Sequence, residues 1–240
     1  MCEWYFHYSK RIYGGTTLKN VMALERSYQD KLRILLIIYY FSKPCTIDGL
    51  PFCKRLMKSE LKIQKIDFLI RNPDYLAIEL LDQVQSFESE DDKEKIQHII
   101  KEIFHSGEPD IRKKDMLRFF FGAYEDIDDI IAFFVARNFL HFVSRRSIDR
   151  RVFEKEYYLT EHGIQKIENE ILPGLPKINW YVERCKLINK YFGDLSGTEL
   201  KARQYQYDEY RLTPLNEPIV EIKDKVIQKY KELFGVNLCV

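Results

Sequence analysis

Two groups of side chains in this 240-residue chain have the types and spacing that could hold a metal ion. Glu102 and His105 stand three positions apart, which places a carboxylate and an imidazole on one face of a helix. A di-metal helical site needs a second copy of this pair, and the sequence contains none, so a chance surface pair is favoured. The run at 125–129 carries four carboxylates, but the dipole and unpaired amides of a helix start favour acidic residues there. The sequence therefore predicts no metal site.

A third group of residues formally matches the short sequence signature of restriction-type nucleases. Pro73-Asp74 is followed by Asp91 and Lys93, and such enzymes need an acidic pair and a lysine on adjacent strands to hold a metal ion. Here Asp91 lies in the highly charged run 86–95, which is typical of a solvated connector or the first turn of a helix. Walker, dinucleotide-binding, Gly-x-Ser-x-Gly and His-Glu-x-x-His motifs are absent from the sequence. We therefore expect a protein without catalytic activity, catalytic residues or cofactors.

The composition narrows the class of protein further. The 38 basic and 37 acidic residues leave a net charge of +1, so the chain lacks the positive field of a non-specific nucleic-acid binder. The longest apolar run, 34–41, is too short to cross a bilayer, which takes about 20 residues. The N-terminal residues show no secretory signal, and the 5 cysteines include no Cys-x-x-Cys pair, which is typical of a reducing compartment. These features predict a cytoplasmic protein that does not enter membranes.

The focused basic feature of the chain is the stretch SRRSIDRR at 144–151. Its arginines are Arg145, Arg146, Arg150 and Arg151. Arginines around a hairpin turn could bind two or three phosphates of a nucleic acid. An equally supported interpretation is a solvated turn whose arginines pair with Glu154 and Glu156. We expect any contact with DNA to be local and to depend on a larger complex.

A narrow apolar stripe marks the last helix that the sequence predicts, at residues 219–234. Its members, spaced three, four, four and three positions apart, are Ile219, Ile222, Val226, Tyr230 and Leu233. Pro214 and Pro218 set this helix apart, and an isolated helix of its length is only marginally stable in water. We therefore expect the stripe to dock on a partner protein or on the chain's own winged helix.

The elements that must position these residues are mostly helices, because glycine (10) and proline (8) are few and apolar residues make up 45% of the chain. Apolar periodicity predicts a helix at 24–42, a second helix that includes residues 50–57, and a third that begins at Ile66. Three short helices with tight joints resemble a helix-turn-helix core. Asn72-Pro73 then ends the third helix and starts the next, at 74–84.

Residues 116–172 carry the clearest pattern. The aromatic segment at 117–124 predicts a strand or an extended stretch, and Asp126 caps a helix that runs through Asn138. A strand at 139–143, a polar turn and a return strand at 152–158 form a hairpin, and Thr160 caps a helix towards Ile171. A helix, a two-stranded wing and another helix form the order seen in winged-helix domains.

Four segments follow from these patterns. They are an N-terminal helical region at 1–86 with a degenerate winged helix at 24–84, an acidic connector and amphipathic helix at 87–115, a winged-helix domain at 116–172 and a C-terminal helical extension at 173–240. In the extension, SGTE at 196–199 is a capping box that starts a helix. The predicted fold class is mainly α, with a small β-hairpin wing flanked by helices.

Four motifs together resemble a known family. They are KLRILLIIYYF at 31–41, IDFLIRNP at 66–73, YLTEHG at 158–163 and SGTELK at 196–201. The chain is similar to the middle, accessory component of three-component ABC-ATPase defence systems of the Lamassu type, which act against phages and plasmids in bacteria. The resemblance spans about residues 31–76 and 117–210, while the acidic insert at 86–95 and the tail from Leu212 depart from it.

The resemblance implies a non-catalytic winged-helix subunit that binds an SMC-like ABC ATPase, of the coiled-coil type that maintains chromosomes, and an effector that is often a nuclease. We therefore expect an accessory subunit that assembles such a defence complex and contacts DNA only through it. The alternative is a stand-alone winged-helix transcription regulator that reads DNA with the helix at 126–138 and the wing. The neutral net charge, and Arg137 as the single basic residue of that helix, count against the alternative.

Overall fold

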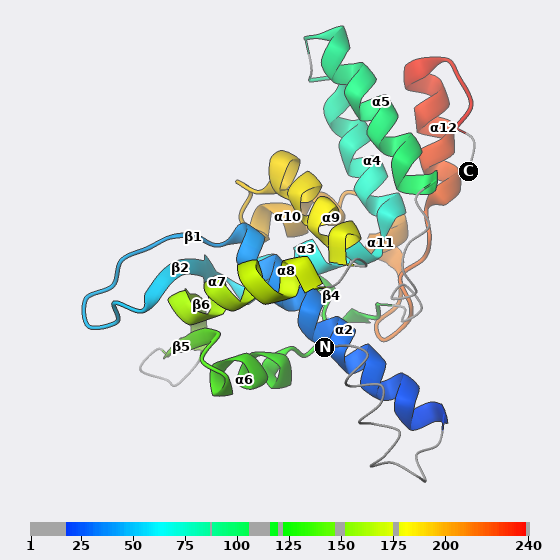
Figure 1. Cartoon of the computed structure of the whole chain (residues 1–240). Coiled ribbons are helices and arrows are strands. Elements are labelled where there is room, and N and C mark those ends of the chain that lie inside the picture. Colours follow the sequence, from blue (N-terminus) through cyan, green and yellow to red (C-terminus); the bar gives the residue numbers. More distant parts are fainter. Residues whose placement is uncertain are drawn as a thin grey trace.

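The computed structural model describes residues 18–86, 88–105, 116–119, 122–146, 152–174 and 178–238, with the backbone alone at 18–26, 146, 152 and 153. The protein is mostly helical, with a small antiparallel sheet to one side of the helices, in agreement with the predicted mainly α class (Figure 1). The main helices are α2 (Leu18–Phe41), α3 (Glu60–Arg71), α4 (Pro73–Val84), α5 (Glu90–His105), α6 (Asp128–Ala136), α7 (Glu161–Lys166), α9 (Ile178–Phe192), α10 (Gly197–Gln204), α11 (Asp208–Leu212) and α12 (Lys223–Phe234). A π-helical turn, Ile167–Ile171, joins α7 to the short α8 (Leu172–Gly174).

The core forms around α2. Five consecutive apolar residues of this helix, 34–38, are buried, and five residues cover the full circumference of an α-helix. Helices α3 and α9 and the strand β6 (Val152–Thr160) contact α2. Residues 34–38 of the helix are therefore covered on all sides, as the continuous apolar run indicates.

The sheet has the strand order β1-β2-β6-β5, and each neighbouring pair is antiparallel. Its other strands are β1 (Lys43–Pro44), β2 (Cys53–Lys58) and β5 (Leu140–Arg146). Strands β5 and β6 form the hairpin that the sequence predicted, and β2 pairs with the other side of β6. Tyr157 and Leu159 share one face of β6 and are buried, so this face of the sheet packs on the helices.

Strand β2 stands where a second helix was predicted for residues 50–57, so that prediction was wrong. Gly49 adopts a φ of +82°, which turns the chain before Pro51, and the turn delivers the segment to β6. The buried Cys53 and Met57 lie four positions apart, a spacing that fits a helix face and the same face of a strand equally well. The next helix, α3, begins at Glu60 rather than at Ile66, and the three consecutive helices of a helix-turn-helix core do not form.

The elements around the hairpin agree with the sequence pattern. Thr160 caps α7 as predicted, and its Oγ1 accepts a hydrogen bond from the Gly163 N–H at 2.9 Å. Asp126 lies one residue before the N-cap of α6, yet its Oδ1 accepts the Asp128 N–H at 2.9 Å. The segment predicted as extended contributes two short strands, β3 (Arg118–Phe119) and β4 (Gly122–Ala123), which pair with each other.

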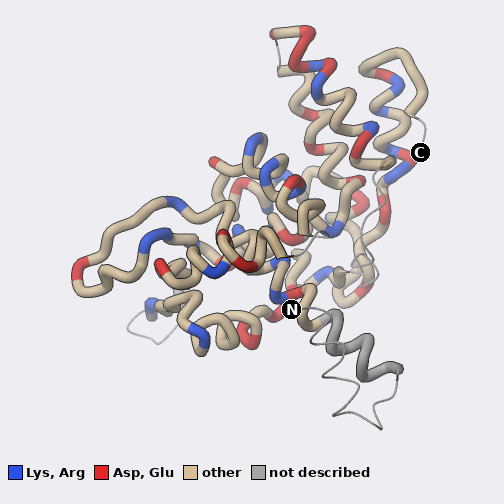
Figure 2. Tube along the Cα trace, in the orientation of Figure 1, with Lys and Arg blue, Asp and Glu red and all other residues tan. Residues whose placement is uncertain are grey.

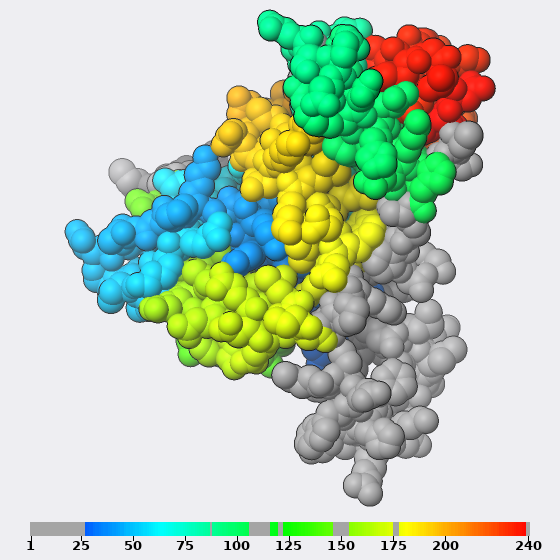
Figure 3. Space-filling model, turned by 45° about the horizontal axis from the view of Figure 1, so that its top comes forward, coloured from blue at the N-terminus to red at the C-terminus, as the bar shows by residue number. Residues whose placement is uncertain are grey.

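Helices α4, α5 and α12 form one end of the molecule, where α12 lies beside the α4–α5 pair (Figures 1 and 3). Pro73 starts α4 as predicted, and the acidic residues 90–92 form the first turn of α5. The Asp74 Oδ2 accepts the Ile222 N–H at 2.7 Å, and the Tyr75 hydroxyl donates to the Val220 carbonyl at 3.0 Å. These two hydrogen bonds anchor the segment that leads into α12 on the first turn of α4.

The capping box predicted at 196–199 is confirmed at the start of α10.

Candidate protein-binding surface

The residues of the nuclease-like signature do not meet on adjacent strands. Asp74 lies in the first turn of α4, where its carboxylate accepts a main-chain N–H of the C-terminal segment. Asp91 and Lys93 lie near the start of α5 and pair with Lys95 and Glu90, each at 2.5 Å. Within the described residues, no three His, Cys, Asp or Glu side chains are grouped so that they could hold a metal ion. The signature residues thus have helix-start and surface roles.

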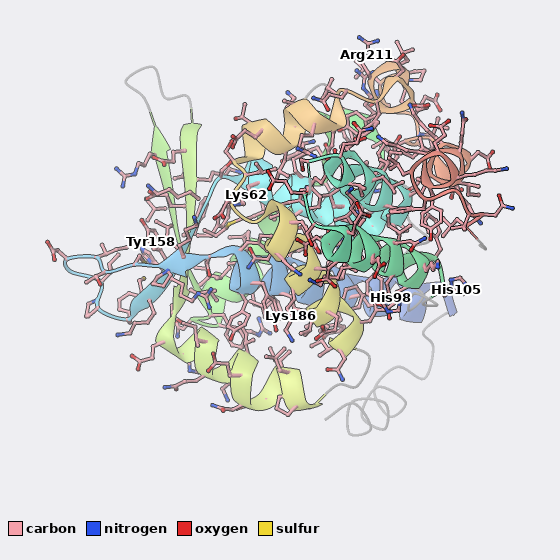
Figure 4. All side chains as sticks on the ribbon, turned by 90° about the horizontal axis from the view of Figure 1, so that it is seen from above. Lys62, His98, His105, Tyr158, Lys186 and Arg211 are labelled. Carbon is pink, nitrogen blue, oxygen red and sulfur yellow. The ribbon has the colours of Figure 1, made fainter. Side chains whose placement is uncertain are left out.

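Glu102 and His105 lie exposed on α5 and have local partners. The His98 Nε2 is 3.2 Å from the Glu102 Oε1, one turn away, and the His105 Nδ1 is 2.8 Å from the Lys101 carbonyl. In Figure 4, His98 and His105 lie on α5, and the other labelled side chains, Lys62, Tyr158, Lys186 and Arg211, come from α3, β6, α9 and α11. The labelled groups thus belong to five different elements.

The acidic run at 125–129 joins elements of the fold. The Glu125 main chain exchanges two hydrogen bonds with the Gln64 side chain, at 2.6 and 3.0 Å, and its carboxylate contacts Arg71. Asp128 pairs with Lys155 of β6 at 3.1 Å. These carboxylates hold the start of α6 against α3 and the sheet.

Arg145 is the member of the basic wing whose side chain the structure describes. Its Nε and Nη2 both lie 3.3 Å from the Glu156 Oε2, and its Nε is 3.7 Å from the Glu154 Oε2. The hydrogen bond to Glu156 and the charges of both glutamates raise the pKa of Arg145. Arg145 therefore has the ion pairs expected of a solvated turn.

The rest of the predicted basic wing lies outside this description. The Arg146 side chain, Arg150 and Arg151 are not among the described groups. In the described chain, basic and acidic residues are interspersed along the trace (Figure 2).

The C-terminal apolar stripe is covered by the chain itself, so its assignment as a partner-binding surface is corrected. It packs beside α4, and its first two members precede α12 rather than lie on it. Intramolecular docking leaves little of these side chains for a partner. Four are buried and the last is partly buried: Ile219, Ile222, Val226, Tyr230 and Leu233.

A short ladder that the sequence pattern did not reveal carries the exposed apolar residues instead. Strand β3 pairs with the segment after α11, which runs beside it (Figure 1). The Arg118 N–H donates to the Glu217 carbonyl at 3.0 Å, and the Asn216 N–H donates to the Arg118 carbonyl at 2.7 Å. The Ile219 N–H donates to the Met116 carbonyl at 3.0 Å. Two segments that are distant in sequence thus form one antiparallel pair.

The two sides of this ladder differ in burial. Met116 and Ile219 are buried on the inner side, while Leu117, Phe119 and residues 214–218 and 220 are exposed. Four of the nine large apolar side chains that are exposed in the described chain belong to these two segments, and a fifth belongs to the last residue of α11; we call these five the ladder surface. They are Leu117 (37% exposed), Phe119 (37%), Leu212 (69%), Leu215 (51%) and Val220 (54%).

A buried lysine and a tyrosine support the ladder from beneath. The Lys65 Nζ donates to the Ala123 carbonyl at 3.2 Å and lies 3.4 Å from the Tyr210 hydroxyl, which accepts the Ala123 N–H at 2.6 Å. Gly122 has a φ of +94°, and a Cβ atom there would lie 2.5 Å from the Tyr210 hydroxyl. Burial, and secondarily the charge of Lys201, lower the pKa of Lys65 to about 7. Strand β4 is therefore fixed closely to α3 and α11, and it holds β3 in place.

Comparisons with protein-family models, with curated proteins and with solved structures gave no match to this chain. Among the described residues, no helix combines the length and apolarity that crossing a bilayer requires. The function must therefore be inferred from the surfaces of the chain itself.

Proposed function

We propose that this chain is a non-catalytic subunit that assembles a protein complex through its ladder surface. The observation that carries the proposal is the presence of four exposed apolar side chains on two paired segments and of a fifth at the end of α11, just before one of them. Exposed apolar side chains that gather in one place are typical of protein–protein interfaces, because a partner removes their area from water. The hydrogen-bonded support beneath β4 keeps this surface in one conformation, which lowers the entropy cost of binding.

The order of elements supports a winged-helix subunit. Helix α6, the β5–β6 hairpin and the Thr160-capped α7 follow one another, and β2 adds a third antiparallel strand. Together with the resemblance to Lamassu-type accessory components, this order supports a cytoplasmic subunit of a bacterial anti-phage or anti-plasmid defence complex. Its proposed partners are an SMC-like ABC ATPase and an effector, often a nuclease, and it contacts DNA through the complex.

The exposed face of α6 argues against a stand-alone transcription regulator, which would insert this helix into the major groove. That face consists of Asp128, Asp129, Ala132, Val135 and Ala136. Major-groove readout relies on side chains that form hydrogen bonds with base edges, and two carboxylates beside small apolar side chains serve it poorly. The Arg137 guanidinium lies 3.7 Å from the centroid of the Phe133 ring. We therefore do not propose that the chain alone recognises DNA, and the experiment below tests this alternative.

Co-expression tests the proposal. The genes beside the one that encodes this chain are read for a coiled-coil ATPase and an effector, and both are purified with the tagged chain. Glutamate at Phe119 and Leu215 would bury unpaired charge in the interface, so the double variant should recover at least tenfold less partner. Phe52→Glu is the matched control, because Phe52 is 45% exposed and lies beside β2, across the molecule from α11 (Figure 1).

The results of this experiment distinguish between the ladder surface as an interface, the defence complex and the transcription regulator. Phe119 and Leu215 are exposed, so the double variant should keep the melting temperature of the wild type, and lost assembly then reports on the interface. Normal assembly of the double variant would contradict the role of the ladder surface. The absence of a coiled-coil ATPase gene would contradict the defence complex, and tight sequence-specific DNA binding by the chain alone would support the regulator.

A further inference from the structure

Two cysteines lie on neighbouring strands at one edge of the sheet. Cys53 is the first residue of β2, and Cys45 directly follows β1; both are free thiols. The Cys45 N–H donates to the Lys54 carbonyl at 3.0 Å, so the pairing of the two strands continues to Cys45. The loop that joins β1 to β2 extends away from the helices (Figure 1). The two thiols thus stand where a short hairpin leaves the sheet.

The register places both thiols on the outer face of the sheet. Pro44, Arg55 and Leu159 are cross-strand partners in a row, and the buried Leu159 puts this row on the inner face. Side chains alternate along a strand, so Cys45, which follows Pro44, faces outward. Cys53 pairs with the residue after Leu159 and therefore faces outward as well. The register shift between Cys53 and Arg55 thus brings the two cysteines to one face.

Burial and spacing agree with this placement. Cys53 is buried, yet it does not belong to the hydrophobic core, as a position on the outer face requires. Neighbouring strands lie about 4.8 Å apart and residues of one strand about 3.4 Å apart, so Cα atoms one position out of register are about 6 Å apart. Disulfides join cysteines whose Cα atoms are about 4.4–6.8 Å apart. Burial, and secondarily the nearby Cys45, raise the pKa of Cys53.

We propose that Cys45 and Cys53 are a redox modification site, at which hydrogen peroxide converts the two thiols into a disulfide that locks the β1–β2 hairpin. Cys45 reacts first, because it is only partly buried. Its thiolate sulfur attacks one peroxide oxygen, the O–O bond breaks, and a sulfenic acid and one water form. The Cys53 sulfur then attacks the Cys45 sulfur, the S–O bond breaks, and a second water leaves. The two thiols give up two electrons and two protons, which the peroxide takes up, and a thiol reductant reverses the change.

The position of the pair gives the disulfide a structural effect. Strand β1 has two residues and one neighbouring strand, so few main-chain hydrogen bonds hold it in place. A covalent bond from Cys45 to Cys53 closes the loop at 46–52 and fixes β1 to β2. Cys185 of α9 is a contrasting thiol: it is 0% exposed, and burial raises its pKa, so it should stay reduced. The site goes beyond the proposed function, since it does not involve the ladder surface.

Peptide mapping of the full-length chain after treatment with hydrogen peroxide tests the proposal. Asp48 lies between the two cysteines, so cleavage before aspartate yields two peptides that stay joined only by a disulfide. The joined peptides should appear, while Cys185 should be alkylated only after the protein is unfolded. Because burial raises the pKa of both Cys45 and Cys53, thiolate is scarce at neutral pH. The rate of joining should therefore rise about tenfold from pH 7 to pH 8.

The melting temperature shows whether the disulfide locks the hairpin. The oxidised wild type should melt about 5–10 °C above the reduced protein, because the bond restricts the unfolded chain. Cys45→Ser and Cys53→Ser should each lose the joined peptides and the rise in melting temperature. Cys2→Ser and Cys239→Ser, at positions outside the described residues, are the matched controls and should keep both. If Cys53→Ser does not fold, Cys45→Ser makes the same test at the more exposed thiol.

The results either support or overturn the redox site. Return of the free thiols and of the lower melting temperature after treatment with dithiothreitol would support it. Accumulation of sulfinic acid at Cys45 without joined peptides would overturn it, as would a disulfide from Cys45 to any other cysteine or to a second copy of the chain. Joined peptides with an unchanged or lower melting temperature would overturn the locking of the hairpin. Failure of the redox site leaves the proposed function unaffected, because co-purification through the ladder surface is measured on the reduced protein.

Discussion

Two buried basic side chains, Arg33 of α2 and Lys65 of α3, show that equal burial can have opposite consequences for the charge of a side chain. The two residues are 2% and 0% exposed. Arg33 lies among carboxylates, whereas Lys65 contacts a main-chain carbonyl and a phenol hydroxyl. The first keeps its charge, and the second gives up its proton near neutral pH. The comparison shows that the partners of a buried charge decide whether it acts as a pH-independent link or a pH-dependent one.

The surroundings of Arg33 join three parts of the chain. Its Nε contacts Asp67 of α3, its Nη1 is 2.8 Å from Asp30, and its Nη2 is 3.8 Å from Glu125, which lies before α6. Arg71 also approaches Asp67, at 3.5 Å. Burial acts to lower the pKa of Arg33, but Asp67 and Asp30 together outweigh it and raise the pKa. Arg33 therefore stays charged at any pH at which the protein folds.

Removal of the Asp67 carboxylate should give the largest effect in this comparison. Asp67→Ala leaves the buried Arg33 and Arg71 without the carboxylate that lies between them, and breaking a buried ion pair typically costs about 3–5 kcal/mol. Urea denaturation should show this loss in the free energy of unfolding. Asp194→Ala is the control, because the exposed Asp194 pairs with the exposed Lys43 and should change stability by about 0–1 kcal/mol. A loss below about 1 kcal/mol for Asp67→Ala would contradict the view that the network links the helices.

Replacement of Lys65 should raise the free energy of unfolding, whereas Asp67→Ala lowers it. The pKa of Lys65 falls to about 7 in the folded chain, while an unfolded lysine titrates at about 10.5. Between these values the unfolded chain binds the extra proton, so stability rises with pH from about 7 to 10.5 and the penalty is complete below pH 7. Lys65→Met removes this penalty and should stabilise the protein at pH 7 by about 1–4 kcal/mol.

The measurement is the difference in the free energy of unfolding between wild type and Lys65→Met from pH 7 to 10. Taking the difference cancels the contributions of the other titrating groups. The stability of the variant should rise less steeply with pH than that of the wild type, and the two curves should converge near pH 10. Parallel curves would show that Lys65 keeps its proton in the folded chain. Lys54→Met is a control, because Lys54 is exposed and pairs with the exposed Glu161 at 3.7 Å.

Sequence patterns predicted the elements whose signals are local. Pro73, Thr160 and the capping box at Ser196 each act within one helical turn, and the structure places helix starts at all three. Strand β2 was missed because the spacing of its buried residues also fits a helix, and its partner β6 lies far along the chain. A local pattern cannot distinguish two structures that only a distant partner separates.

The C-terminal stripe and the ladder surface were even harder to predict from the sequence. The spacing of the C-terminal stripe indicated that another element covers it, but the burial of Val226 and Tyr230 beside α4 depends on how distant helices pack. Part of the ladder surface lies in a proline-containing segment, with Leu215 and Val220 on either side of Pro218, and no helical period in that segment points to the apolar residues. Only the pairing with β3 places them together.

Removal of the Tyr210 hydroxyl should give the smallest of these effects and shows how the lysine and the ladder are connected. Tyr210→Phe leaves the buried Ala123 N–H without its acceptor, and an unsatisfied buried donor costs about 1–3 kcal/mol. Because the same hydroxyl lies 3.4 Å from the Lys65 Nζ, the two substitutions should not be additive, and their double-mutant cycle should give a coupling of about 0.5–1.5 kcal/mol. Tyr39→Phe, which removes an exposed hydroxyl bonded to Glu168, is the control and should cost about 0.5 kcal/mol or less. Additive changes in the free energy of unfolding for Tyr210→Phe and Lys65→Met would mean that the lysine and the tyrosine hold β4 independently, and the pH dependence of Lys65 would then leave the support of the ladder surface unchanged.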